Sequence, residues 1–261
     1  MRLGRTLPGA YLARFGDMAK VPDPVYYIGK PELLKRRAVS IVGTRRPCAY
    51  TKQMTTRLAS ALAERGAVVV SGAAMGVDAL AHRGAGAKNT VAVVAGGVDV
   101  RYPAVNAPLI ETIEKEGLVL SRFEAGARPR PWSFVVRNEM VVALGEVLVV
   151  AEADRRSGSM RSVEYALKMG KPVYVLPHRL GESEGTNDLL REKKAEPIYD
   201  IDAFAARFGE KKKVQEEPLL AFCAEVPTLQ EALDRFGQRV YEAELEGRIE
   251  IRDGLVYPVT G

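Results

Sequence analysis

Arginines and small residues recur at the points where short apolar segments of the sequence end. Gly43-Thr44-Arg45-Arg46 follows the apolar run 38–42, and Ser71-Gly72 opens a glycine-containing stretch after the run 68–70. A guanidinium group can bond phosphate through two N–H groups, and small residues leave backbone N–H groups open to an anion. These residues therefore predict a phosphate site. The alternatives are a solvated arginine pair at the first position and a turn capped near Asp78 at the second.

One segment near the middle of the chain combines basic side chains with aromatic rings. Arg128 and Arg130 alternate with prolines, and the only tryptophan, Trp132, precedes Phe134 and Arg137-Asn138. Single-stranded nucleic acid suits such a surface, because cations follow its backbone and each base can stack on a ring. We expect Trp132 to seat the following helix in the core, and the sequence leaves Phe134 open between core and ligand.

Three further loops repeat this chemistry after predicted strands. One supplies Arg101 and Tyr102, a second supplies Ser157-Gly158-Ser159, and a third ends in Gly185-Thr186-Asn187, which could cap a helix or contact the ligand. Each loop alone is a weak indication. Parallel strands would bring all of them to one edge of a sheet, which makes the set more specific than any member.

Few residues of the sequence indicate a catalytic site, a metal site or a cofactor site. The strand ends lack the glycine spacings of dinucleotide and nucleoside-triphosphate sites, and no nucleophile elbow occurs. His82 and His178 have no suitably spaced partners for a metal. Asp99 suits a turn better than a catalytic acid, and Asp154 could neutralise Arg155. We therefore expect no enzymatic activity, no metal and no cofactor.

The hydrophobic pattern predicts a scaffold that brings these loops together. Apolar runs of strand length alternate with helix-period segments, and several runs are apolar on consecutive positions. Burial on both faces explains such runs, so an α/β fold with a parallel sheet flanked by helices is expected. The predicted strands are 38–43, 67–71, 90–95, 118–123, 146–152, 172–176 and 197–199, and the predicted helices are about 50–65, 77–87, 105–116, 133–144, 159–169, 186–194 and 201–208.

Composition shifts divide the chain. Residues 1–37 are predicted to be a loop-like lead-in, with a short helical piece at 33–37, that packs on a main domain at 38–209. A charged linker follows at 210–217, and Pro218 opens a small module at 218–261.

The small module has a winged-helix pattern of helix, turn, helix and hairpin. Thr228 and Glu231 fit a capping box, and Asp253-Gly254 is a strong hairpin signal. The second helix carries three acidic residues that would repel phosphates, namely Glu242, Glu244 and Glu246. We expect this module to bind protein or only to pack, with DNA binding as the alternative.

The charge is divided unevenly. The chain of 261 residues has a formal net charge of +5 at pH 7, yet residues 210–261 contain 7 Lys and Arg against 11 Asp and Glu. Residues 1–209 contain 31 against 22, so the whole basic excess lies there, as expected for a domain that meets a polyanion. A basic surface without a partner is the alternative.

Cysteine content and hydropathy indicate the compartment. Cys48 and Cys223 lie 175 positions apart, which is neither a zinc pattern nor a disulfide framework. No apolar run approaches about 18 residues, and the N-terminus has no signal-peptide core. We therefore expect a cytoplasmic protein without membrane contact.

Taken in order, the motifs of residues 24–199 resemble those of the DprA/Smf DNA-processing family. The shared stretches include I-V-G-T-R-R-P, S-G-A-A-M-G-V-D, V-A-V-V-A-G-G-V-D and F-V-V-R-N, followed by V-x-E-A, S-G-S and G-T-N. The resemblance implies an extended Rossmann-like three-layer fold with a mostly parallel sheet, often followed by a winged-helix-like module. It also implies a recombination mediator that binds single-stranded DNA, loads a RecA-type recombinase in natural transformation or repair, and commonly forms a homodimer. The family is not known for catalysis.

The resemblance implies a pocket at residues 43–46 and 71–76, beside residues 134–138, with donors from 157–159. Val135 and Glu139 depart from the family's usual F-P-x-R-N-R, so one expected basic contact becomes acidic. Combined with the basic loops, this predicts DNA contacts at Gly43, Thr44, Arg45, Arg46, Ser71, Gly72, Gly76, Arg101, Arg128, Arg130, Phe134, Arg137, Asn138, Ser157, Gly158 and Ser159.

Two alternatives belong to other functional classes. A nucleoside-monophosphate phosphoribohydrolase on a related Rossmann fold needs a glutamate where this chain has Ser162, so general acid–base help is lacking. Release of adenine from AMP would favour that enzyme. The other alternative is a passive adaptor that works through its acidic C-terminal module, which loss of DNA binding on deletion of 210–261 would favour.

Overall fold

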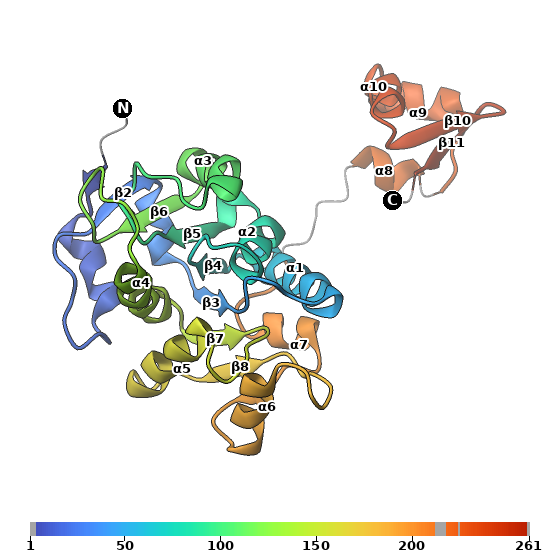
Figure 1. Cartoon of the computed structure of the whole chain (residues 1–261). Coiled ribbons are helices and arrows are strands. Elements are labelled where there is room, and N and C mark those ends of the chain that lie inside the picture. The colour runs from blue at the N-terminus through green and yellow to red at the C-terminus, as the bar shows by residue number, and fades with distance from the viewer. Residues whose placement is uncertain (1–3, 212–217, 224, 260–261) are drawn as a thin grey trace. The chain divides into compact units, whose positions relative to one another are not determined.

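The computed structural model describes residues 4–211, 218–223 and 225–259, and its contacts divide the chain into two compact units (Figure 1). The larger unit comprises residues 1–211 and the smaller one residues 212–261. The larger unit contains all the strand-end loops predicted to bind phosphate.

A nine-stranded sheet, counted over the described residues, runs through the larger unit in the order β1-β2-β6-β5-β4-β3-β7-β8-β9. Strands β3 to β9 pair in parallel, whereas β2 pairs antiparallel with β6 and β1 antiparallel with β2. The chain moves outward from β3 to β6 and then returns to lay β7 on the other side of β3, which creates a switch point between these two strands. The strands are β1 Arg5–Thr6, β2 Tyr26–Gly29, β3 Ala38–Val42, β4 Val68–Ser71, β5 Thr90–Val93, β6 Leu118–Ser121, β7 Val147–Val150, β8 Val173–Val175 and β9 Glu196–Pro197.

Helices cover both faces of the sheet and form the outer two of three layers (Figure 1). One face packs against the 3-10 turns η1 (Gly9–Phe15) and η2 (Pro31–Lys35) and the helices α4 (Pro131–Leu144), α5 (Gly158–Lys168) and α6 (Glu184–Arg191). The other face packs against α1 (Ala49–Glu64), α2 (Val77–Ala85), α3 (Ala107–Glu116) and α7 (Ile201–Ala206), and the short turns η3 (Ala87–Asn89) and η4 (Ala104–Asn106) precede β5 and α3.

Strand β3 shows why the apolar runs are continuous. Val39 and Ile41 belong to one core and Ala38 and Val42 to the opposite core, so the strand is buried on both faces. Burying each aliphatic side chain contributes roughly 1.5–3 kcal/mol, which favours apolar residues at every position. The predicted α/β, Rossmann-like class with a mostly parallel sheet is confirmed.

The lead-in is more structured than the sequence predicts. Tyr26–Gly29 forms β2 beside Leu118–Ser121, about ninety positions further along the chain, and the short helical piece lies at Pro31–Lys35. Gly29 has a φ of 108°, and a Cβ atom there would clash with the carbonyl oxygen of Gly117. A four-residue strand has too little periodicity to be recognised without its distant partner.

The smaller unit, as far as it is described, contains short helices and a two-stranded hairpin. Thr228 and Glu231 form the predicted capping box, with N···O distances of 2.9 and 3.2 Å. Asp253 and Gly254 both have positive φ, which suits a two-residue hairpin turn. Winged-helix character stays a prediction, and residues 212–217 of the predicted linker lie outside the described residues. The elements are α8 Pro218–Cys223, α9 Leu229–Phe236, α10 Arg239–Leu245, β10 Ile249–Arg252 and β11 Leu255–Pro258.

Among the helices of the described residues, none combines the length and the apolar character needed to cross a bilayer.

Candidate nucleic-acid interface

The loops after β3, β4 and β5 meet at one edge of the sheet around a small pocket that is partly open to solvent. Parallel pairing of these strands brings their carboxyl ends to this edge. Three of the predicted DNA contacts line the pocket, namely Arg45, Gly72 and Phe134. Tyr102 and Pro129 also line it. The pocket therefore unites segments more than eighty positions apart in the sequence.

An arginine and two aromatic rings lie together in this pocket. The Cζ atom of Arg45 is 5.5 Å from the centroid of the Phe134 ring, and the Tyr102 ring is 5.9 Å from the same ring. Arg45 and Arg46 are exposed, and neither forms an ion pair with any residue that the structure describes. Tyr102 is exposed and Phe134 is half-buried. A cation beside accessible aromatic rings is the combination that holds the backbone and the bases of a single strand.

The loop after β4 packs tightly on the loop after β3. Gly76 has a φ of 75°, and a Cβ atom there would overlap the carbonyl oxygen of Thr44. The N–H group of Val77 donates to the same oxygen (3.1 Å). Gly76 is therefore required by the close approach of two backbones. Gly43 and Thr44 are half-buried beneath the exposed arginines.

Three N–H groups of the loop after β4 are bonded within the protein. Those of Gly72 and Ala74 donate to Oδ2 of Asp78 (3.1 and 3.4 Å), and that of Ala73 donates to Nε2 of His82 (3.3 Å). Of the two alternatives for this loop, the structure therefore shows the turn closed by Asp78, and these N–H groups are not available to an external anion. Burial raises the pKa of the Asp78 carboxyl, and a nearby guanidinium opposes that shift.

Two of the predicted contacts, Arg137 and Ser71, are buried below the pocket. Nη1 of Arg137 donates to the carbonyl oxygens of Gly72 and of Val93, the latter at 2.9 Å. Oγ of Ser71 donates to the carbonyl oxygen of Ile41 (2.7 Å). Both side chains tie strand ends together, so they position the pocket wall. Asn138, half-buried, accepts from Nε of Arg137 (3.2 Å).

A buried hydrogen-bond chain supports the same loop from behind. Oγ1 of Thr90 donates to the carbonyl oxygen of Val69 (2.9 Å), so Nδ1 of His82, 2.5 Å from that hydroxyl, must be the donor to it. Burial, with a smaller contribution from Arg137, lowers the pKa of His82 to about 3. No group of His, Cys, Asp and Glu able to hold a metal occurs in the described part of the chain.

Arg101 is held by carboxylates of α3. Its Nε and Nη2 atoms bond the two oxygens of Glu114 (2.9 and 2.7 Å), and Nη1 bonds Glu111 (3.0 Å). These hydrogen bonds raise the pKa of Arg101. Contrary to the prediction of a free phosphate contact, its charge is matched by two carboxylates. Its neighbour Tyr102 lines the pocket.

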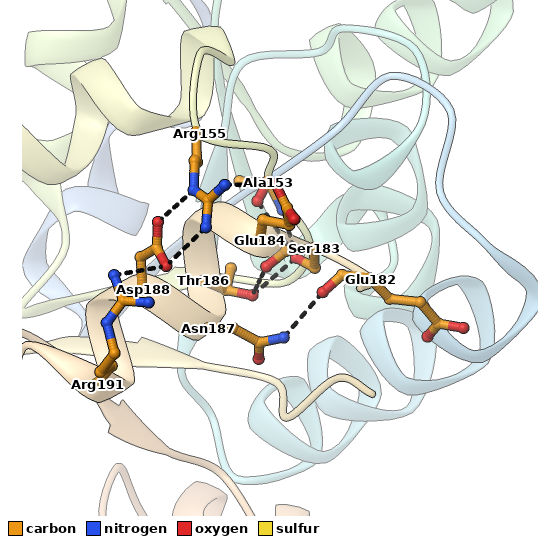
Figure 2. Close-up of polar contacts among 9 residues, drawn as sticks. All are labelled: Ala153, Arg155, Glu182, Ser183, Glu184, Thr186, Asn187, Asp188 and Arg191. Atoms are coloured by element: carbon orange, nitrogen blue, oxygen red, sulfur yellow. Dashed lines mark hydrogen bonds and ion pairs between the residues drawn. The ribbon is translucent and has the colours of Figure 1, made fainter. Parts of the chain in front are cut away.

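Arg155, in the loop after β7, is likewise engaged. Figure 2 shows its guanidinium between two carboxylates of α6, at 2.9 Å from Glu184 and 2.6 Å from Asp188. Asp188 also pairs with Arg191 (3.0 Å). The expectation that Asp154 neutralises Arg155 is therefore wrong, because the partners come from a helix about thirty positions away.

Residues 185–187 fasten the same loop to α6. The carbonyl oxygen of Ala153 accepts from the N–H groups of Gly185 and Thr186 (2.9 and 3.3 Å), and Nδ2 of Asn187 donates to the carbonyl oxygen of Glu182 (2.9 Å; Figure 2). A Cβ atom at Gly185 would lie 2.6 Å from the Ala153 oxygen. Of the two roles predicted for residues 185–187, capping a helix or contacting the ligand, the structure shows the first, because these residues form the start of α6.

Ser157, Gly158 and Ser159 open α5 at the end of β7 and do not line the pocket. Gly158 is exposed and Ser159 is buried. Oγ of Ser157 is a buried atom without a hydrogen-bond partner among the described residues. The N–H of Thr44 donates to the carbonyl oxygen of Glu152 (2.8 Å), so the loops after β3 and β7 adjoin. The predicted contacts are thus divided between the pocket and a neighbouring loop.

The segment before α4 is exposed, as its composition suggests. Arg128 and Arg130 are both exposed. The expectation that Trp132 seats α4 in the core is wrong, because its side chain is 55% exposed. Sequence reasoning also left Tyr102 out of the predicted contacts. For Trp132 and for Tyr102, the sequence signal that could have indicated an exposed aromatic ring was an arginine within two positions of it.

Comparison with known proteins shows the family of this chain. The model of the family described as DNA recombination-mediator protein A matches residues 7–209. The chain is 32% identical over 201 residues to the protein Smf of Synechocystis, covering 74% of this chain and 50% of that protein. It is 34% identical over 191 residues to the DNA processing protein DprA of Streptococcus pneumoniae, covering 71% and 67% respectively. The chain spans about half the length of the first curated relatives it matches.

A solved structure of DNA processing protein A from Helicobacter pylori, reported for its single-stranded DNA binding mode, has a TM-score of 0.76 to this chain. The two are 40% identical, and the match covers 78% of this chain and 94% of that one.

Proposed function

We propose that this chain, which belongs to the DNA recombination-mediator protein A (DprA/Smf) family, binds single-stranded DNA at the pocket after β3, β4 and β5. The observation that carries the proposal is Arg45 over the ring of Phe134, without an ion-pair partner among the described residues. A base stacked on Phe134 or Tyr102 would place its phosphate within reach of the guanidinium. The single-stranded DNA binding of the Helicobacter pylori relative supports this assignment.

The pocket suits an unpaired base. A duplex keeps its bases stacked on each other, so their faces are not available to Phe134 and Tyr102, whereas a single strand can turn a base into the pocket. Affinity for the strand then combines stacking with phosphate neutralisation by Arg45 and Arg46. This predicts a preference for single strands over duplex of the same length.

We infer that the site binds and does not catalyse. The residues that line the pocket, as described, contribute one arginine and one tyrosine hydroxyl but no carboxylate, histidine or cysteine. A tyrosine hydroxyl acts as a nucleophile or general acid–base group when an adjacent base or a shifted pKa activates it, and the residues that line this pocket supply no such base. This composition favours a DNA-binding protein over a phosphoribohydrolase.

The wider role follows from the family. A recombination mediator delivers single-stranded DNA to a recombinase, and we propose that this chain loads a RecA-type recombinase during DNA uptake or repair, as a homodimer in the cytoplasm. The test is the rate at which the recombinase forms filaments on DNA already coated with single-strand-binding protein. We expect faster filament formation with the wild-type chain than with a variant lacking Arg45 and Arg46, and a sedimentation mass of two chains.

The binding site is tested by fluorescence anisotropy with a labelled oligo-dT and a duplex of equal length, at two salt concentrations. Removal of the ring in Phe134→Ala is expected to weaken single-strand binding by about 1–3 kcal/mol, the usual value of one stacked base. Tyr199→Ala is the matched control, because Tyr199 is also an exposed aromatic residue of the larger unit and does not line the pocket. Equal affinity of wild type and Phe134→Ala, or preference for duplex, would contradict the proposal.

A further inference from the structure

Trp132 forms an exposed aromatic surface that the pocket does not use. Its side chain is 55% exposed on the first turn of α4, and its ring meets the ring of Phe123 edge-on, with centroids 5.6 Å apart and an interplanar angle of 74°. The N–H of Phe123 donates to Oγ of Ser121 (3.0 Å), which fixes the supporting residue. We name Trp132 with Phe123 the Trp132 shelf. The indole is braced from one side and open to solvent on the other.

Cations flank this shelf. Arg128 and Arg130 lie four and two positions before Trp132, both are exposed, and neither forms an ion pair with a residue that the structure describes. Glu124 is the exposed carboxylate of the same loop. The shelf also lies at the N-terminal end of a 14-residue helix, where the backbone carries a partial positive charge. The surface around the indole is therefore complementary to a phosphate backbone.

The shelf and the pocket lie on two flanks of the same helix turn. Phe134 and Pro129 line the pocket, and Trp132 falls between them in the sequence. A helix turns about 100° per residue, so Trp132 and Phe134 project roughly 200° apart around α4. A strand that leaves the pocket and crosses the start of α4 would meet Arg130 and then the indole.

We propose that Trp132 is a second base-stacking site, occupied by a nucleotide of the same single strand whose other base enters the pocket. Arg128 and Arg130 would neutralise the phosphates between the two bases. The inference rests on the proposed function, since it extends the strand already placed at Phe134. Stacking platforms bind any base through its ring face, so the site would have little sequence preference.

The test uses Trp132 as its own probe, because it is the only tryptophan of the chain. Oligo-dT carrying a dye that does not overlap tryptophan emission is titrated into the full chain, and anisotropy and tryptophan fluorescence are recorded together. We expect quenching of Trp132 with the same midpoint as the anisotropy rise, and lower accessibility of the indole to acrylamide. An oligonucleotide with abasic sites along its length should bind more weakly and leave the emission unquenched.

Variants provide the second measurement. Trp132→Ala is expected to raise Kd by about 5- to 150-fold, the equivalent of one stacked base, while Trp132→Phe should stay within a few-fold of wild type. Val135→Ala is the control, since Val135 is exposed one turn further along α4 and has no ring. Because Trp132 is exposed, all three variants are expected to have wild-type melting temperatures.

Each contrary outcome is distinguishable. If the oligonucleotide binds but Trp132 is not quenched and Trp132→Ala binds equally well, the second site is overturned and the pocket stands. If Trp132→Ala loses recombinase loading without losing DNA affinity, the shelf binds protein and the inference is also overturned. If wild type binds no single-stranded DNA at all, the proposed function and the shelf both fail.

Discussion

The loops after β3 and β7 leave neighbouring strands at the switch point of the sheet, and each carries two successive arginines. In the loop after β3, Arg45 and Arg46 are exposed and have no ion pair with any described residue. In the loop after β7, Arg155 is clamped by Glu184 and Asp188 of α6. The loops have similar composition and a similar place in the sheet. The first presents both of its arginines, whereas the second presents only Arg156, which is exposed and has no ion pair with any described residue.

The difference lies in the element packed against each loop. The loop after β3 is covered by Gly76 and the backbone after β4. The carboxylate that reaches this loop, that of Glu152, accepts from the N–H of Cys48 (3.0 Å) and pairs with neither arginine. The loop after β7 is covered by the first turns of α6, whose carboxylates point back at Arg155 (Figure 2). A strand-end arginine is therefore available to DNA only where the neighbouring helix leaves it unpaired.

The largest effect is expected from removing the cations that are available. The double variant Arg45→Ala, Arg46→Ala should raise the Kd for oligo-dT by about 10- to 100-fold and reduce the salt slope by about 1.4, since each lost phosphate contact on a single strand contributes roughly 0.7. Gel-shift or anisotropy titrations at several salt concentrations measure both quantities. Arg155→Ala is the matched control and should leave both unchanged. Equal losses in the two variants would remove the distinction between the loops.

A second effect concerns the loop after β4, which forms part of the pocket wall. A Cβ atom at Gly72 would clash with Nη1 of Arg137, so Gly72→Ala should destabilise the fold by about 1–3 kcal/mol and weaken DNA binding. Gly158→Ala is the control, because nothing lies within 4 Å of a Cβ atom there. Urea denaturation of both variants measures the difference. Unchanged stability of Gly72→Ala would show that Arg137 does not hold the loop after β4 in place.

A pH effect is expected from the histidine behind the same loop. His82 stays neutral in the folded state until its pKa of about 3, whereas in the unfolded chain it takes up a proton below about pH 6.5. Stability should therefore fall as pH decreases from about 6.5, by up to about 1.4 kcal/mol per pH unit from this group. The slope of unfolding free energy against pH between 6.5 and 5 should be lower in His82→Gln. Equal slopes in wild type and His82→Gln would contradict the buried, neutral state of His82.

The smallest effect is expected from variants that leave Arg155 unpaired, as Arg45 is, so that the loop after β7 resembles the loop after β3. Neutralising the clamp with Glu184→Gln and Asp188→Asn should release Arg155 and lower the Kd for oligo-dT by about two- to five-fold at low salt. The control with the same change in net charge is Glu164→Gln with Glu192→Gln, two exposed carboxylates of other ion pairs. If both double variants gain affinity equally, the gain comes from net charge and not from Arg155.

The parallel sheet was predictable because strands such as Val147–Val150 are buried on both faces and read as continuous apolar runs. The antiparallel β2 was not, because its four residues pair with a strand about ninety positions away. The pocket position of Phe134 followed from motif resemblance and aromatic spacing. Which arginines are ion-paired was not predictable, because Arg101 and Arg155 pair with carboxylates on helices 10 to 33 positions away in the sequence.

Trp132 shows a different limit. An apolar aromatic residue at the start of a helix is usually part of a core, and the chain offered no periodic signal to the contrary. Only the folded arrangement, with Phe123 on one side and solvent on the other, shows the ring to be exposed.

The central claim is that an unpaired base lies against Phe134 beside Arg45. Its most direct test is photo-crosslinking of an oligonucleotide that contains 4-thiothymidine, followed by mass-spectrometric mapping of the modified peptide. We expect crosslinks in residues 128–137 and 100–103, with their loss in Phe134→Ala. Crosslinks confined to residues 218–259 would contradict the account, since they would place the DNA on the C-terminal unit.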